Sequence, residues 1–227
     1  MQGDVAMPGD RTTPIGWICP SRHRKTAPDT GAPGRIGVQP ATLAETDDVA
    51  SVLAEAFLND PTWSWAFPDP AARLRYWRVC VAEALRYPWV LRCDGYEAVA
   101  VWIPPGGTEF SAETEARLPR LLVDLVGPRA ADVGELIRRF GVAHPRREPH
   151  YYLSLLGTAD AHRGRGLGLA LLRENLARID TVRVPAYLES SNPRNNHLYE
   201  SVGFVSVASF GAPGGGPIVT GMWRPSA

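Results

Sequence analysis

Hydrophobic and polar positions alternate along this chain with two periods, which predict strands and helices in turn. Residues 151–156 form an aromatic and apolar run typical of a buried strand, and from Leu167 to Ile179 apolar residues recur at the spacing of one helical face. Between these segments lie glycines at positions 164, 166 and 168. We therefore predict a unit of strand, glycine loop and helix, around which the other elements are arranged.

The remaining periodic segments predict strands and helices on both sides of this unit. The predicted strands cover 36–41, 89–93, 96–103, 185–190, 205–210 and 218–223, and the predicted helices cover 46–59, 70–85, two stretches of 111–142, and 193–202. Asp94-Gly95 predicts a two-residue hairpin turn between the second and third strands. Residues 60–70 are bounded by prolines and predict a loop, which carries Trp63, Trp65 and Phe67.

Residues 1–35 differ from the rest of the chain. They contain five prolines and a basic cluster at 22–25 but no sustained hydrophobic period. Such a segment buries too little apolar surface to offset the entropy of ordering it. We predict a disordered extension over 1–35, followed by a single folded domain over 36–226.

Charge and cysteine content exclude several classes of partner. The 24 basic and 24 acidic residues give a formal net charge of zero, so neither nucleic acid nor an anionic membrane is an expected partner. No apolar run reaches the roughly 18 residues of a membrane helix. The three cysteines lack metal-ligand spacing and cannot all pair within one chain. We therefore expect a cytoplasmic protein without a metal.

The glycine loop has the chemistry of an anion site. Glycines at the start of a helix let unpaired backbone N–H groups converge on one small volume, which the positive helix end, Arg163 and Arg165 reinforce. The loop lacks the third glycine of a dinucleotide fingerprint and the lysine of a phosphate loop. Residues 163–168 instead match Arg/Gln-x-x-Gly-x-Gly/Ala. Here the chain resembles the GCN5-related N-acetyltransferases (GNAT), whose loop of this form holds the pyrophosphate of acetyl-coenzyme A.

This resemblance implies an α/β fold, with a central twisted mixed sheet, helices on both faces, and two parallel strands, 151–157 and 185–190, that splay apart to admit the pantetheine arm. It also implies a strand bulge beside a backbone N–H of residues 155–157 that polarises the thioester carbonyl. The residues it assigns to acetyl-coenzyme A are Leu156, Gly157, Thr158, Arg163, Gly164, Arg165, Gly166, Leu167, Gly168 and Asn192.

A second motif supplies the candidate catalytic groups. Residues 192–204 resemble the family's Asn-x-x-x-x-x-x-Tyr-Glu-x-x-Gly-Phe helix, which implies that Tyr199 lies near the coenzyme sulfur and protonates the departing thiolate. The alternative for Tyr199 is a buried ring whose hydroxyl caps a carbonyl. Glu189, at the end of the second splayed strand, is a candidate general base because apolar neighbours raise a carboxyl pKa. The alternatives are a structural or substrate-orienting carboxylate, or a route through water and backbone carbonyls without a base.

Longer segments, including 98–102, 144–149 and 185–195, resemble the puromycin N-acetyltransferases and their actinobacterial relatives over 36–224. This implies a monomeric or homodimeric enzyme that acetylates the primary amine of a small molecule in a ternary complex. The tryptophan-rich segment 60–70 departs from those enzymes, so puromycin itself is not implied. We predict that Trp63 or Trp65 faces the acceptor and that Phe67 packs inward. A non-catalytic acyl-coenzyme A sensor and a protein or peptide N-acetyltransferase remain open alternatives.

Overall fold

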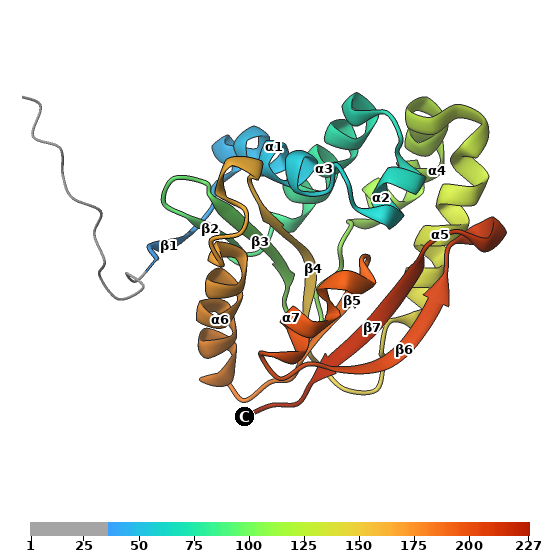
Figure 1. Ribbon diagram of the computed structural model, residues 1–227. Helices are drawn as coiled ribbons and strands as arrows, with labels where there is room; N and C mark the ends of the chain where they lie inside the picture. The colour runs from blue at the N-terminus through green and yellow to red at the C-terminus, as the bar shows by residue number, and fades with distance from the viewer. Residues whose placement is uncertain (1–35) are drawn as a thin grey trace, which may run out of the picture. The chain divides into compact units, whose positions relative to one another are not determined.

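A computed structural model of the protein describes residues 36–227, which form one seven-stranded mixed sheet with helices on both faces (Figure 1). This confirms the predicted fold class. The extension predicted over 1–35 lies outside the described residues. None of the helices formed by residues 36–227 is long and apolar enough to cross a bilayer.

The seven strands lie in the order β1-β2-β3-β4-β5-β7-β6. Their bounds are β1 Val38–Pro40, β2 Val90–Cys93, β3 Ala98–Ile103, β4 Tyr151–Thr158, β5 Ala186–Ser190, β6 Val205–Gly211 and β7 Ile218–Arg224. The α-helices are α1 Thr46–Ala56, α2 Pro61–Ala66, α3 Pro70–Ala84, α4 Ala112–Val126, α5 Ala130–Ala143, α6 Leu167–Asp180 and α7 Asn196–Glu200. All neighbouring strands pair antiparallel except β4 and β5, which pair parallel.

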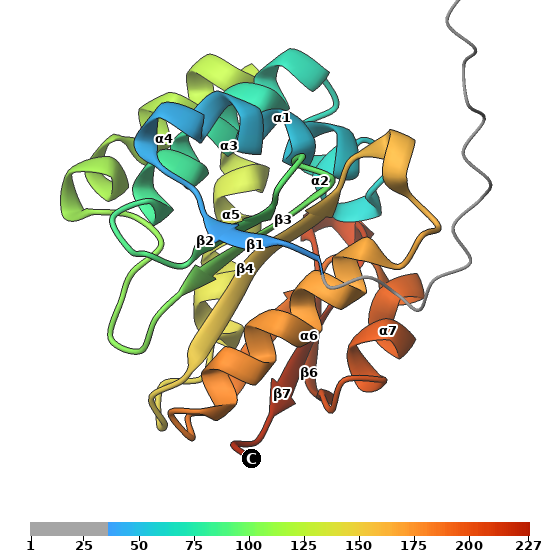
Figure 2. The same cartoon turned by 90° about the vertical axis from the view of Figure 1, so that its left-hand side faces the viewer.

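Helices cover the middle of the sheet on both sides, with α1 and α3 on one face and α6 on the other (Figure 2). Every residue of β3 is therefore buried, which explains why the strand reads as a continuous apolar run. Alternate residues of β3 enter two separate cores. Val99 and Val101 pack with the helices of the α1 face, whereas Ala100 and Trp102 pack against α6.

The two parallel strands separate as they leave the sheet's base, as predicted. Pairing joins only Tyr151–Leu153 of β4 to Ala186–Leu188 of β5, although β4 continues to Thr158. In the same region β4 bulges against β3, because Val101 pairs with Leu155 while Trp102 pairs with Leu153. Ser154 is the additional residue of this bulge. The splay opens a wedge, and the bulge precedes the residues that face it.

Two local predictions are wrong. The segment after Asp60 is the short helix α2 and not a loop, because the Asp60 carboxylate accepts the N–H groups of Thr62 and Trp63 and Pro61 occupies the first helical position. The turn between β2 and β3 is longer than the two residues Asp94-Gly95. It covers residues 94–97 and includes Tyr96, whose φ of 58° is left-handed and whose hydroxyl donates to Glu45.

Candidate active site

The glycine loop borders a cavity of about 540 Å³ at the open end of the wedge. Its walls come from the end of α1, the second half of β4, the start of α6 and the segment from β5 to α7. Of the residues that the sequence assigned to acetyl-coenzyme A, those on the wall are Leu156, Thr158, Arg163, Gly164, Gly166, Leu167, Gly168 and Asn192. Gly157 and Arg165 are not among the lining residues.

Two of the loop glycines adopt a backbone conformation that disfavours side chains. Gly164 and Gly166 have φ values of 75° and 73°, and a Cβ at either position would meet no atom within 4 Å. Gly168 has a different role, since its Cβ would lie 2.6 Å from Thr158 Oγ1. The first glycines therefore shape the loop, and the third lets α6 approach β4.

The start of α6 presents unpaired backbone donors to this cavity. Ala170 is the first residue of the helix whose backbone N–H donates a hydrogen bond, and its acceptor is the carbonyl of Gly166 at 2.9 Å. The N–H groups of Leu167, Gly168 and Leu169 have no acceptor within residues 36–227. Together with the positive helix end they form a site for an anion.

The two loop arginines have different partners. Arg163 donates to the carbonyl oxygen of Ala56 at 2.6 Å and pairs with the Asp160 carboxylate at 2.7 Å, so it fastens the loop to the end of α1. Arg165 lies outside the cavity wall and contacts His162 Nδ1 at 2.9 Å. The sequence motif did not distinguish these positions.

A second cavity, of about 650 Å³, lies on the α1 face of the sheet. Aromatic rings form much of its wall, and they come from Phe57, Trp63, Tyr76, Trp77, Phe140 and Tyr152. Trp63 lies at the centre of this group, with ring centroids 4.8 Å from Trp77 and 5.7 Å from Phe140. Trp65 is not on the wall and packs under the Arg129 guanidinium instead. Phe67 is fully buried, as predicted.

The two cavities meet at four residues that line both, namely Phe57, Leu156, Ser191 and Tyr199. Tyr199 projects from α7, is half-buried, and its hydroxyl has no hydrogen-bond partner within the described residues. Burial and the nearby negative charge of Asp60 raise the pKa of Tyr199 to about 12. The phenol therefore keeps its proton at neutral pH and can donate it. Asp60 also accepts from Ser191 Oγ at 2.7 Å, which ties α2 to this junction.

Glu189 faces the second cavity from β5. Its side chain is only 2% exposed, and neither carboxylate oxygen has a hydrogen bond of good geometry within residues 36–227, although the Tyr152 and Tyr187 hydroxyls lie beside it. The nearest cationic candidate is His144, whose Nδ1 lies 3.7 Å from Glu189 Oε1. The predicted role of Glu189 as general base remains a prediction.

Three further residues of this cavity were missed from the sequence. Glu109 follows β3, and His144 and His150 flank the linker that leads to β4. His144 begins the segment 144–149 that resembles the puromycin N-acetyltransferases, but the resemblance gave none of the three a site role, and none lies in a periodic segment. Their proximity to Glu189 arises only when β3, β4, β5 and the end of α5 come together.

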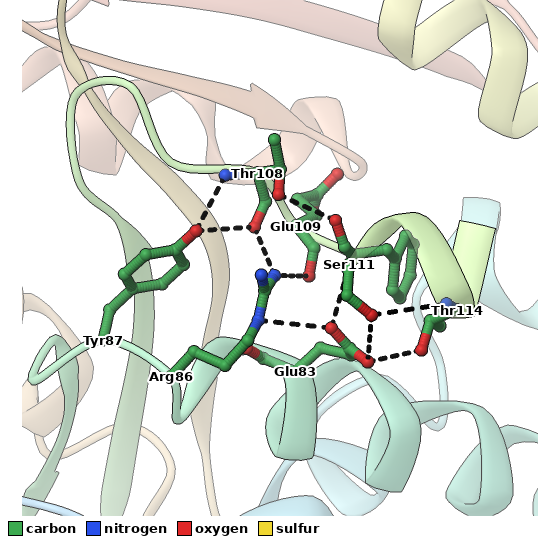
Figure 3. A network of polar contacts seen from close by, with 8 residues as sticks. Glu83, Arg86, Tyr87, Thr108, Glu109, Ser111 and Thr114 are labelled. Carbon is green, nitrogen blue, oxygen red and sulfur yellow. Dashed lines mark hydrogen bonds and ion pairs between the residues drawn. The ribbon is translucent and has the colours of Figure 1, made fainter.

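A polar network holds the segment between β3 and α4 that carries Glu109 (Figure 3). Glu83 of α3 accepts from the backbone N–H of Ser111 at 2.8 Å and from its Oγ at 3.0 Å, while Arg86 donates to the carbonyl of Thr108 at 2.8 Å. Beyond this network, Ser154 of the β4 bulge donates to Glu109 Oε1 at 2.6 Å. The Glu109 residue is exposed to solvent as a whole, but its carboxyl group lies in the cavity, where desolvation and the negative charge of Glu189 raise its pKa to about 7.

Replacing Glu109 with glutamine is expected to change how stability depends on pH. Because the folded-state pKa of about 7 exceeds the ordinary value of 4.5, folding favours the protonated form. This stabilisation is complete below pH 4.5 and is lost as the pH rises to about 7. The Tm of the wild type should therefore fall relative to that of Glu109→Gln across this window. Thermal denaturation at several pH values measures this difference in Tm. Parallel Tm profiles of the wild type and Glu109→Gln would contradict the prediction. Glu113→Gln, at an exposed position, is the control.

Part of the chain matches a known protein family. Residues 129–206 match the family described as Acetyltransferase (GNAT) domain. The matched segment runs from the start of α5 into β6 and contains both the glycine loop and Tyr199.

Solved structures share the fold over most of the chain. A protein of Corynebacterium glutamicum ATCC 13032, described as histone acetyltransferase HPA2 and related acetyltransferase, is 29% identical over 85% of this chain and 97% of its own, with a TM-score of 0.57. Arylalkylamine N-acetyltransferase 2 from Aedes aegypti gives a TM-score of 0.61 at 12% identity. The similarity covers 85% of this chain and 99% of the Aedes aegypti chain. Drosophila melanogaster polyamine N-acetyltransferase gives a TM-score of 0.55 at 16% identity. The similarity covers 84% of this chain and 99% of the Drosophila chain.

The last two similarities are similarities of fold. The family match covers the glycine loop and the Tyr199 helix, and the Corynebacterium glutamicum protein shares both fold and sequence with this chain. The protein therefore has the fold of these enzymes and is an N-acetyltransferase, and its residues 129–206 match the acetyltransferase (GNAT) domain.

Proposed function

We propose that the protein transfers the acetyl group of acetyl-coenzyme A to the primary amine of a small molecule, by direct attack within a ternary complex. The observation that carries this proposal is the meeting of two cavities at Tyr199. One cavity has the donors of an anion site, and the other has an aromatic wall with carboxylates. A donor and an acceptor held in the two cavities would react at their junction.

The residues of the 540 Å³ cavity fit coenzyme A. The unpaired N–H groups at the start of α6 suit its pyrophosphate, and the space into which side chains at Gly164 and Gly166 would project remains free for it. Beyond Leu153, the edge of β4 that faces the wedge lacks a strand partner, so its backbone groups are free for the amides of pantetheine. When bound, acetyl-coenzyme A supplies an activated acetyl thioester.

The chain itself supplies two of the functions that acetyl transfer requires. Tyr199 is the proton donor to the departing sulfur, because its hydroxyl lies at the junction and remains protonated at neutral pH. A backbone N–H after the Ser154 bulge, at Leu155 or Leu156, polarises the carbonyl. No side-chain nucleophile is required, because the amine attacks directly.

The second cavity favours an acceptor that combines an aromatic or apolar body with a cationic amine. Its rings offer flat apolar surfaces, Glu189 offers negative charge, and Glu109 adds to this charge as it ionises near pH 7. The small amines named for the Aedes aegypti and Drosophila melanogaster enzymes are compatible with this class. Within it we propose an aminonucleoside or an antibiotic-like amine, in keeping with the resemblance to puromycin N-acetyltransferases, as the finer assignment.

An acceptor panel tests the proposal. Purified protein with acetyl-coenzyme A would be offered tryptamine, agmatine, puromycin and a lysine peptide, and thiol release and the mass of the product would be recorded. We expect N-acetylated tryptamine or puromycin at a higher rate than acetylated peptide. Acetylation of the peptide alone would replace the small-molecule proposal by the protein-acetylating alternative. Coenzyme binding without acetylation of any acceptor would favour the sensor.

Trp63→Phe is expected to raise the KM for an aromatic acceptor such as tryptamine about 2- to 10-fold, because an aromatic contact contributes about 0.5 to 1.5 kcal/mol. Coenzyme affinity should not change, since Trp63 lines only the acceptor cavity. Steady-state kinetics and coenzyme calorimetry measure the two effects. Trp65→Phe, which lies outside both cavities, is the matched control. Equal KM changes in the two variants would remove Trp63 from the acceptor site.

A further inference from the structure

The buried Glu189 carboxylate lies in a setting that requires a partner. Burying a charged group without a counter-ion is costly, and within residues 36–227 Glu189 has only the neutral Tyr152 and Tyr187 hydroxyls beside it and no hydrogen bond of good geometry. Its side chain is 98% buried yet lines the acceptor cavity. A ligand with hydrogen-bond donors would satisfy it.

Hydrogen bonding determines which nitrogen of His150 carries the proton. His150 Nδ1 lies 2.7 Å from the carbonyl oxygen of Glu148, and a carbonyl only accepts, so Nδ1 must be the donor. Burial lowers the pKa of His150, which favours the neutral ring. In the neutral ring Nε2 is then an acceptor.

The tautomer of His150 determines which nitrogen of His144 carries a proton. The Nε2 atoms of the two rings are 3.1 Å apart, so His144 Nε2 must be the donor of this hydrogen bond. In a neutral His144 the lone pair is then on Nδ1, and this atom faces Glu189 Oε1 at 3.7 Å. Two acceptors therefore face each other across a gap without a proton between them.

The other ionisable groups around this gap do not fill it. Glu109 belongs to the same cavity and supplies no cation. The Tyr152 and Tyr187 hydroxyls lie beside Glu189 and keep their protons, because burial raises the pKa of each, so they are neutral donors that leave the charge of Glu189 without a counter-ion. Arg146, also on the cavity wall, donates to the carbonyl of Gly141 at 3.0 Å. Arg147 and Glu115 lie on the wall as well, and neither contacts Glu189 or His144 within the described residues. The gap suits a small cation that has several N–H donors.

We propose that Glu189 and His144 bind the ammonium group of the acceptor and that His144 takes its proton, while His150 is a positioning residue that keeps His144 Nδ1 free. This inference rests on the proposed function and identifies the acceptor as a primary ammonium. An N–H bond of R–NH₃⁺ breaks and a new N–H bond forms at His144 Nδ1. The electron pair stays on the amine, which becomes the nucleophile, and the imidazolium beside Glu189 later releases its proton to solvent.

The first test needs no acceptor. Nitrogen-15 NMR of histidine-labelled protein near pH 8, assigned with single His→Gln variants, should show His150 protonated at Nδ1 and His144 protonated at Nε2. The opposite tautomer at His144 would overturn the proposal. His150→Leu, which removes the acceptor, should release the His144 tautomer, whereas His150→Gln, which can still accept a hydrogen bond, should retain it. A purely structural role for His150 would leave the His144 tautomer unchanged in both variants.

The second test measures charge recognition by calorimetry, with coenzyme A present. Tryptamine is the cationic probe, and tryptophol, which has a hydroxyl in place of the amine, is its neutral analogue. The wild type should bind tryptamine at least tenfold more tightly than tryptophol. Glu189→Gln should remove most of this preference, whereas Glu115→Gln, a change on the same cavity wall, should not. Equal affinity of the wild type for both probes, or equal effects of the two variants, would overturn the proposal.

These outcomes are independent of turnover. If the acceptor panel yields no amide product, the proposed function fails even when the His144 tautomer and the tryptamine preference are as stated. If tryptamine is acetylated but His144 carries its proton on Nδ1, only the ammonium site fails.

Discussion

Replacement of Tyr199 by phenylalanine is expected to lower kcat by a factor of about 10² to 10⁴, the loss typical of a missing general acid. The substitution keeps the ring, which packs 6.3 Å from Phe204, and removes only the hydroxyl at the junction of the two cavities. Coenzyme affinity and Tm should remain close to those of the wild type. Single-turnover kinetics with an acceptor from the panel measure the chemical step directly.

The control for this substitution is Tyr151→Phe. Tyr151 is also a buried tyrosine of the sheet region, but it packs against Trp89 on the α6 side and lines neither cavity. Loss of its hydroxyl should leave kcat unchanged. A loss of less than about threefold in Tyr199→Phe, with chemistry limiting the rate, would show that Tyr199 is a packing residue.

Gly168→Ala is expected to weaken coenzyme A binding at least tenfold. The new Cβ would lie 2.6 Å from Thr158 Oγ1, so the Thr158 side chain or the start of α6 must shift. Thr158 is β-branched and stiff at χ1, so we expect the helix start to move and to displace its unpaired N–H groups. A hydrogen bond to a charged group contributes about 1.5 to 3 kcal/mol. Isothermal titration calorimetry with coenzyme A measures the loss.

A second substitution should reverse the first. Thr158→Ala removes the obstructing oxygen, and the remaining Cβ of residue 158 would lie 4.0 Å from the new methyl group, an ordinary contact. The double variant should therefore recover most of the affinity. Gly134→Ala in α5, where a Cβ would meet only Leu122 at 3.8 Å, controls for the added methyl group. If Gly168→Ala binds coenzyme A as tightly as the wild type, this loop does not hold the pyrophosphate.

The cavity beside the glycine loop was largely predictable because most of its residues are local in sequence. Strand, glycine loop and helix follow one another within 30 residues, so the backbone donors at the start of α6 follow from the positions of Gly164, Gly166 and Gly168 alone. The splay and the bulge of β4 were implied by the family resemblance and are present. Even here the motif did not show that Arg163 binds the end of α1 while Arg165 lies outside the cavity.

The acceptor side was not predictable because its residues come from distant segments. The hydrophobic period of residues 60–67 was too short to reveal α2, whose start depends on a single Asp60 cap. Glu109, His144 and Glu189 have no shared sequence pattern, and 80 positions separate the first from the last. Their meeting depends on the β3-β4-β5 pairing and on the path of the chain after α5.

Local periodicity and glycine placement thus determined the fold class and the anion site, since both depend on neighbouring residues and on backbone hydrogen bonds. Which tryptophan faces the cavity, which histidine nitrogen is free and which carboxylate is unpaired depend on contacts between elements far apart in the chain. Trp63 and Trp65 are two residues apart, yet only Trp63 lines the acceptor cavity, because packing against Trp77 and Phe140 directs its ring there while Arg129 covers Trp65.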